Sequence, residues 1–142
     1  HVGEDEVGIL LVKQRGQLLR FAYPLELYRG GLNFFPLTLP SVAGRVVRTK
    51  QGFVHNDMAT ISHLQIYERI RVADRPAHPI QKMVAGPLVH LTGEPVGVLE
   101  VCRKAPTMRE AGPDFTDLDL LKLTDFGQVL APYLVRFMPD DF

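Results

Sequence analysis

Met83 to Lys104, MVAGPLVHLTGEPVGVLEVCRK, is the stretch that decides the fold. Two runs rich in β-forming residues, Met83 to Leu91 and Val96 to Lys104, flank the turn sequence Thr92-Gly93-Glu94-Pro95, so the stretch predicts a β-hairpin. Apolar residues nearly fill the second run, which is typical of a strand covered on much of both faces and therefore central in its sheet. The isolated Gly97 within it predicts a close approach by a neighbouring backbone or helix.

A second hairpin is predicted near the N-terminus. Val7 to Val12 and Leu18 to Tyr23 are short β-forming runs, and the segment between them contains Gly16 and has the composition of a turn. The acidic run Glu4-Asp5-Glu6 precedes the first strand. It could pair with a partner, but a solvated terminus is the simpler interpretation.

A short helix and a short strand are predicted between the hairpins. Val42 to Lys50 has a helical pattern, Ser41 can cap its free amides, and Gly52 is expected to end it. A strand is expected over Gly52 to His55, followed by a turn at Asn56-Asp57. A nucleophilic role for Ser41 is not favoured, because the chain lacks the G-x-S-x-G sequence that exposes such a serine.

Two further helical segments follow. Ile61 to Val72 contains helix-forming residues without a clean apolar stripe, which predicts a short or broken helix. Thr116 and Asp119 resemble a capping box at the start of a long C-terminal helix. Pro132 is expected to kink this helix or to end its regular part near Ala131. The helix is predicted from apolar residues that recur every three or four positions: Leu118, Leu121, Phe126, Val129, Leu130, Tyr133, Leu134 and Phe137.

Composition restricts the classes of function. The chain has 142 residues, 46% of them apolar, which suits one domain with its own core. Its 16 basic and 16 acidic residues balance, so we expect neither nucleic-acid nor membrane binding. The only cysteine, Cys102, excludes an internal disulfide and a cysteine-built zinc site, and it fits a reducing, cytoplasmic location. No apolar run approaches the roughly 20 residues of a membrane-spanning helix.

Three stretches resemble GAF domains. Ser41 to Asp57 (SVAGRVVRTKQGFVHND) resembles their helix, turn and strand. Met83 to Leu88 (MVAGPL) and Gly93 to Val101 (GEPVGVLEV) resemble two strands that follow later in the family. The order and spacing of the three stretches give the resemblance its weight. It covers roughly Val7 to Leu134, and the usual first helix is absent.

The resemblance implies an α+β fold of the GAF/PAS type. We expect a central antiparallel sheet of five or six strands, helices on one face, a ligand pocket roofed by the irregular middle segment, and a long C-terminal helix. GAF domains typically sense small molecules, and many act only as dimerisation modules. They usually lie beside output domains such as histidine kinases, diguanylate cyclases, HD-type phosphohydrolases or transcription-activating domains. The fold alone does not choose among these functions.

Cyclic-nucleotide-binding members carry Asn-Lys, later Phe, then three residues and Asp-Glu. The matching places here hold Arg103-Lys104, Phe115 and Asp119-Leu120. Lys104, Phe115 and Asp119 fit the pattern, whereas Arg103 and Leu120 depart from it. The resemblance implies that the Lys and Asp brace the structure rather than touch ligand. The partial match therefore supports the fold more than a cyclic nucleotide, which stays open as a ligand.

Other cofactors known from the family fit less well. Covalent bilin attachment needs a pocket cysteine commonly followed by His, whereas Cys102 lies in a predicted strand and precedes Arg103. Methionine sulfoxide reductases of this fold need several cysteines for their disulfide cycle, so that activity is not expected here. Haem stays open, because His63 or His78 could supply an axial imidazole. No cofactor is identified by the residues themselves.

Candidate ligand-binding residues lie where such domains place their pocket walls: Phe35, Asn56, Asp57, Met58, Tyr67, Arg69 and Met83. Each has a simpler alternative, since the apolar members could fill the core and Asn56-Asp57 could only make a turn. Arg69 could hold an anion or merely be exposed. Asp57 with His55 and His63 could be imagined as metal ligands, but their spacing matches no strong metal-binding pattern, so we predict no metal site.

We therefore predict a single GAF-like domain over residues 1–142, with a core at 7–134, excised from a longer signalling protein. It is expected to be a regulatory module without catalytic activity. A small molecule would bind beneath the middle segment and change the C-terminal helix, which would pass the signal to an attached output domain. The alternative is a module with a filled core that forms a homodimer through this helix. Ligand identity, oligomeric state and output domain stay undetermined.

Overall fold

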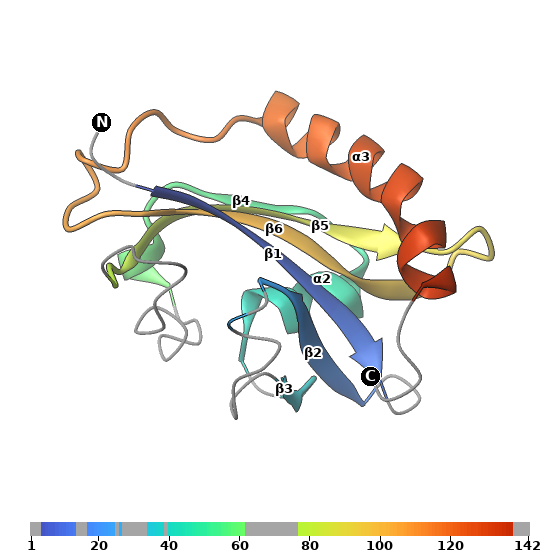
Figure 1. The fold of residues 1–142 in the computed structure, drawn as a ribbon. Helices are drawn as coiled ribbons and strands as arrows, with labels where there is room; N and C mark the ends of the chain where they lie inside the picture. The colour runs from blue at the N-terminus through green and yellow to red at the C-terminus, as the bar shows by residue number, and fades with distance from the viewer. Residues whose placement is uncertain are drawn as a thin grey trace.

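Six strands and three helical segments make up the computed structural model, which describes residues 4–13, 17–24, 26, 34–38, 40–61 and 77–137 (Figure 1). The strands form one antiparallel sheet in the order β3-β2-β1-β6-β5-β4. Their bounds are β1 Glu4–Lys13, β2 Leu18–Tyr23, β3 Phe34–Pro36, β4 Phe53–His55, β5 Ile80–Val89 and β6 Pro95–Lys104. The helices are α2 Val42–Thr49, the 3-10 turn η1 Met58–Thr60, and α3 Asp117–Arg136.

The sheet confirms both predicted hairpins, β1–β2 and β5–β6. It also confirms that β6 is central, because β6 pairs with β1 on one side and with β5 on the other. Gly97 faces the β1 backbone so closely that a Cβ atom added there would lie 2.1 Å from the Leu10 carbonyl oxygen. A side chain cannot be accommodated at that distance, which is the close approach that the sequence predicted.

Helix α2 begins as predicted and ends earlier than predicted. The Ser41 hydroxyl accepts a hydrogen bond of 2.9 Å from the Gly44 amide, as an N-cap does. The expected stop at Gly52 is wrong, because the helix ends at Thr49 and Lys50 takes the left-handed C-cap conformation with φ at 56°. The Lys50 amide then donates to the Val46 carbonyl, which satisfies a carbonyl of the last turn.

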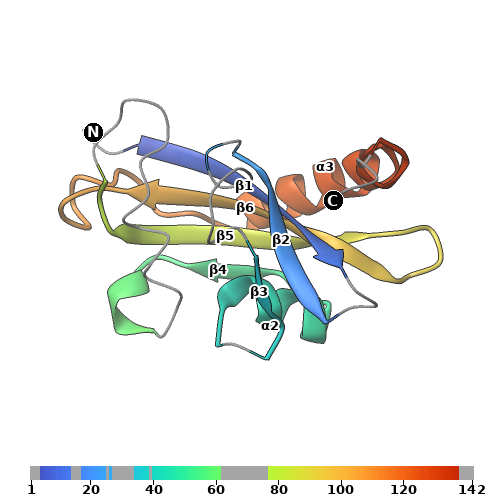
Figure 2. The same ribbon diagram turned by 60° about the horizontal axis from the view of Figure 1, so that its bottom comes forward.

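The two longer helices lie on opposite faces of the sheet (Figures 1 and 2). The helices were expected on one face, and that prediction is wrong. Strand residues alternate between the faces: Leu10 and Val98 pack with α2, whereas their neighbours Leu11 and Leu99 pack with Ala131 of α3. The α2 side holds the larger core, formed mainly by Leu10, Leu19, Phe21, Val42, Val46, Met58, Met83, Ala85 and Val98. The sheet therefore separates two apolar layers.

Helix α3 confirms the predicted capping box. The Asp119 amide donates to the Thr116 hydroxyl at 3.2 Å, and the Thr116 amide donates to the Asp119 carboxylate at 2.8 Å. Of the two outcomes expected at Pro132, a kink or an end near Ala131, the end is wrong, because the helix continues through Pro132 to Arg136. Burial of Ala131 and half-burial of Leu134 against the sheet place apolar contacts on both sides of the proline.

Glycines bring α3 close to the sheet. A Cβ atom at Gly86 of β5 would meet Leu123 at 2.9 Å, and one at Gly52 would meet Leu120 at 2.7 Å. Gly127 of the helix lies against Leu88 in the same way, at 3.1 Å. Small residues on both partners thus allow the helix to seat its leucines directly on β4 and β5. The predicted broken helix over 61–72 lies, apart from Ile61, outside the described residues.

Candidate functional site

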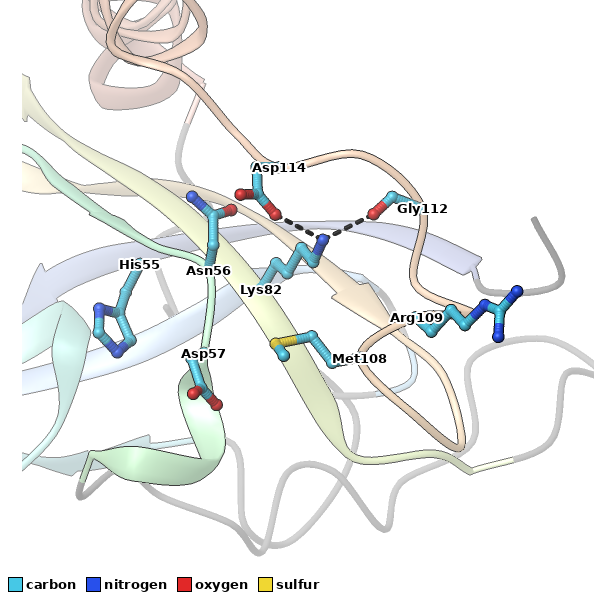
Figure 3. A pocket seen from close by; sticks show the side chains of 8 residues that line it. All are labelled: His55, Asn56, Asp57, Lys82, Met108, Arg109, Gly112 and Asp114. Carbon is cyan, nitrogen blue, oxygen red and sulfur yellow. Dashed lines mark hydrogen bonds and ion pairs between the residues drawn. The ribbon is translucent and has the colours of Figure 1, made fainter.

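A pocket of about 610 Å³ lies at one end of the sheet, between the β4–η1 segment and the connection from β6 to α3 (Figure 3). This volume is within the range of small-molecule sites. The lining residues come from β4, β5 and the connecting loop: His55, Asn56, Asp57, Lys82, Met108, Arg109, Gly112 and Asp114. They include both predicted turn residues, Asn56 and Asp57. The pocket therefore lies where part of the predicted site is, but its other wall is the 105–115 loop, which sequence analysis did not single out.

Lys82 is the buried charge of this site. It lies on β5, on the face that carries α3, because Gly86 four residues later contacts Leu123. Its ammonium donates to the Gly112 carbonyl at 2.6 Å and to the Asp114 carboxylate at 2.7 Å (Figure 3). The Lys82 side chain is 6% exposed, whereas that of Asp114 is 68% exposed. The ion pair thus joins a buried cation to a carboxylate at the surface.

Asn56 holds the same loop at a second point. Its side-chain amide donates to the Phe115 carbonyl at 2.9 Å, and its side-chain oxygen accepts from the Phe115 amide at 2.7 Å. Both amide functions of Asn56 are therefore committed to the backbone of one residue. Because Phe115 directly precedes the N-cap Thr116, Asn56 fixes the entry into α3. Asn56 thus lines the pocket while it stabilises the loop.

Other charged groups that line the pocket can still form hydrogen bonds or ion pairs with a ligand. The Asp57 backbone carbonyl accepts from the Thr60 hydroxyl at 2.7 Å, but its carboxylate makes no hydrogen bond or ion pair with another described residue. The same holds for the Arg109 guanidinium. In Figure 3, Met108 projects between the loop and β5, whereas Arg109 extends away from the other side chains. His55 pairs with the Thr60 hydroxyl at 3.2 Å.

Arg103 completes the attachment of the loop. Its guanidinium lies 4.2 Å from the centre of the Phe115 ring and donates to the Pro113 carbonyl, and its Nε donates to Asp5 at 3.2 Å. The pKa of Asp119 is lowered, first by the hydrogen bond from the Thr116 backbone and additionally by the nearby Arg103 charge. Arg103 therefore packs on Phe115 and binds the loop at Pro113.

Lys104 has a structural contact, but with Glu6 of β1 and not with Asp119. Adjacent strand residues point to opposite faces, so Lys104 lies on the α2 face, where its ammonium pairs with Glu6 at 2.7 Å. The acidic run is likewise no solvated terminus, since Asp5 and Glu6 both belong to β1 and pair with β6. These pairs hold the end of β1 against its neighbour.

A second, much smaller cavity lies on the α2 face. It has about 30 Å³, room for one or two waters, and Glu6, Glu100 and Lys104 line it together with Phe21, Pro24, Ile80 and Cys102. Burial raises the pKa of Glu100 to about 7, against the opposing attraction of Lys104. This carboxyl has no hydrogen-bond partner among the described residues. Sequence analysis missed Glu100, because a glutamate in a central strand carries no local signal of its surroundings.

The predicted ligand-binding residues fall into three groups. Asn56 and Asp57 line the larger pocket. Met58 and Met83, predicted as pocket walls, instead belong to the α2-side core, with exposed fractions of 0% and 4%. The side chain of Phe35 and the residues Tyr67 and Arg69 lie outside what the structure describes.

The described ranges contain no group of three or more His, Cys, Asp or Glu side chains that could hold a metal ion, and His63 lies outside these ranges. None of the helices in this part of the chain has the length and apolar character needed to cross a bilayer.

A six-stranded antiparallel sheet with helices on both faces and a long C-terminal helix defines an α+β fold of the GAF/PAS type. The sequence profile of the GAF domain matches residues 2–130. The chain belongs to the GAF domain family. No curated protein matches the sequence.

Solved structures share this fold at low sequence identity. A type II free methionine-R-sulfoxide reductase from Thermoplasma acidophilum has a TM-score of 0.63 and 15% identity, with 96% of this chain and 82% of that chain covered. The GAF domain of a two-component sensor histidine kinase from Bacillus halodurans has a TM-score of 0.60 and 17% identity, with 94% of this chain and 82% of that chain covered. A free methionine-R-sulfoxide reductase from Neisseria meningitidis, in complex with its substrate, has a TM-score of 0.60 and 20% identity, with 89% of this chain and 64% of that chain covered.

These neighbours correct one prediction. The chain was expected to lack catalytic activity because GAF domains typically act as sensors, yet two of the similar structures are enzymes. The prediction is therefore wrong: proteins of this fold include reductases, so an enzymatic role is open to it.

Proposed function

We propose that this GAF domain binds a small molecule in the 610 Å³ pocket and that binding changes the position of α3. One observation supports this most directly. The pocket residues Asn56 and Lys82 make the hydrogen bonds that hold Phe115, Asp114 and Gly112, the residues immediately before the helix. A ligand that alters these bonds acts on the start of α3 without an intervening element.

Coupling requires that the ligand prefer one arrangement of the loop over another. The Asp57 carboxylate, which has no partner among the described residues, and the Met108 side chain offer polar and apolar contacts to such a ligand, in keeping with small-molecule sites. In the longer signalling protein that we propose, α3 passes the change to an attached output domain in the cytoplasm, such as a histidine kinase, diguanylate cyclase or HD-type phosphohydrolase. The likeness to the GAF domain of a sensor histidine kinase supports such a context.

The test combines native mass spectrometry of freshly purified protein with thermal shift against a broad metabolite panel that includes cyclic nucleotides. A bound ligand at 100 times its Kd should stabilise the domain by about 2.7 kcal/mol. Met108→Trp places a larger side chain in the pocket and should reduce that stabilisation. Leu91→Trp, at a residue that is 92% exposed on the β5–β6 turn, is the matched control. Absence of both a co-purified mass and a thermal shift would count against the proposal.

A homodimer through α3 is the second candidate, favoured by the outward face of that helix. Opposite the sheet-facing leucines, large apolar residues are between 56% and 69% exposed: Leu118, Leu121, Phe126, Val129, Tyr133 and Phe137. A second copy could cover this stripe by packing the same face against it. Val129→Glu should then yield monomers in analytical ultracentrifugation, whereas Gln128→Glu, one position away, should not. A wild-type monomer at high concentration would contradict the dimer.

A further inference from the structure

Lys82 is a buried cation whose neutralisation depends on one exposed residue. Its side chain is 6% exposed, and its charge is balanced by Asp114 alone among the described residues. A buried charge needs a counter-charge, because the low-dielectric interior does not solvate it. Lys82 cannot move into solvent without unpacking β5. Asp114, at 68% exposure on a loop, can be hydrated as soon as it leaves.

Asp114 therefore occupies a position that another anion could take. The ammonium has three donors, of which one goes to the Gly112 carbonyl and one to Asp114, so a replacing oxyanion would find one or two donors in place. The 610 Å³ pocket borders this ammonium, and a ligand of ordinary metabolite size fits it. In Figure 3 the Lys82 ammonium points to the loop, where Asp114 and Gly112 converge on it.

The charges around the pocket permit this exchange. Once Asp114 has turned to solvent, the remaining fixed charges are Lys82, Arg109 and Asp57. With His55 neutral they sum to one positive charge. The Asp57 carboxylate points away from the Lys82 ammonium in Figure 3, so an anion at Lys82 does not meet it directly.

We infer that the pocket recognises a small molecule through a carboxylate or phosphate group that replaces Asp114 on Lys82. This inference rests on the proposed function and adds to it the ligand class and the point of regulation. Asp114 lies two residues before the N-cap Thr116, so its release frees one of the attachments that hold the segment before α3. The Asn56–Phe115 attachment stays in place. The helix start therefore becomes looser without detaching.

Inorganic phosphate and acetate serve as probes, with chloride keeping the ionic strength constant. Binding is followed by the amide chemical shifts of Gly112, Asp114 and Thr116 in the full chain. Asp114→Asn removes the internal competitor at an exposed site and should tighten phosphate binding about tenfold. Lys82→Met keeps an unbranched side chain, leaves no buried charge and should abolish binding at these amides. Asp117→Asn, which makes the same charge change on α3, is the matched control and should leave the affinity unchanged.

The outcomes separate this inference from the proposed function. If a metabolite found by mass spectrometry binds equally to wild type, Asp114→Asn and Lys82→Met, the domain is a sensor but Lys82 is not its anion site. If phosphate causes shifts that persist in Lys82→Met, it is an adventitious ion only, and the inference is overturned. Tighter binding in Asp114→Asn together with loss in Lys82→Met supports it, whether the natural anion is a carboxylate or a phosphate; the ratio of the two probe affinities tells these apart.

Discussion

Substitution of Glu100 gives the sharpest test of how this sheet handles a buried charge. Glu100 is 8% exposed, and its side chain lies against Gly8, where an added Cβ atom would be 2.9 Å from its Cγ. Burial raises the pKa of this carboxyl from 4.5 to about 7, while Lys104 partly opposes the rise. The folded protein therefore holds the Glu100 proton more tightly than the unfolded chain does.

The sign of the pH dependence follows. Below about pH 4.5 the carboxyl is neutral in both states, so it does not penalise folding. As the pH rises through the unfolded and then the folded pKa, the unfolded chain releases the proton first and stability falls. A rise from 4.5 to about 7 corresponds to a loss of about 3 kcal/mol, complete above the folded pKa, at roughly 1.4 kcal/mol per pKa unit. Relaxation around the charge makes this an upper bound.

Glu100→Gln keeps the size of the side chain and removes the titration. Urea unfolding of both proteins from about pH 5 to about pH 8 should show a stability difference that grows with pH, up to about 3 kcal/mol in favour of the variant. Glu94→Gln, at an exposed glutamate of the β5–β6 turn, is the control and should leave the pH dependence unchanged. Parallel stability curves for wild type and Glu100→Gln would refute the reasoning, because Glu100 would then titrate alike in both states.

Three further substitutions test the packing and the attachments. Gly97→Ala should lower the free energy of unfolding, measured in urea, by more than about 3 kcal/mol. The new Cβ would meet the Leu10 carbonyl oxygen, so the backbones of β1 and β6 would have to move apart. Thr116→Ala should cost about 1 kcal/mol by the same measurement, through loss of the N-cap of α3. Asn56→Ala should lower the free energy of unfolding by about 2 kcal/mol and raise the rate of amide exchange at Phe115. The reason is that both hydrogen bonds between the Asn56 side chain and the Phe115 backbone are lost. Unchanged unfolding midpoints would contradict each in turn.

Sequence reasoning predicted the elements whose signals are local. The Thr92–Pro95 turn lies between two β-forming runs, and both strands formed there. Ser41 and Thr116 cap helices within three residues of themselves, so their roles follow from short-range spacing. The close backbone approach at Gly97 was predictable, because a glycine inside an apolar strand commonly marks such an approach.

The site could not be predicted in the same way, because its contacts join distant residues. Lys82 and Asp114 are 32 residues apart, and Asn56 and Phe115 are 59 apart. No spacing rule relates such pairs before the sheet order is known. The different contacts of Arg103 and Lys104 follow once the strand is known, since strand alternation places these neighbours on opposite faces.

The attachments at Phe115 anchor one end of α3, so a small tilt of the helix displaces its other end. Helix α3 has 20 residues and is therefore about 30 Å long. A tilt of about 5° around its anchored start would displace its far end by roughly 2.5 Å, about half the pitch of an α-helix. Shifts of about 1–2 Å between packed helices already accompany allosteric transitions at subunit interfaces. Loosening one ion pair at Asp114 could thus be amplified by geometry alone into a signal that a neighbouring domain can detect.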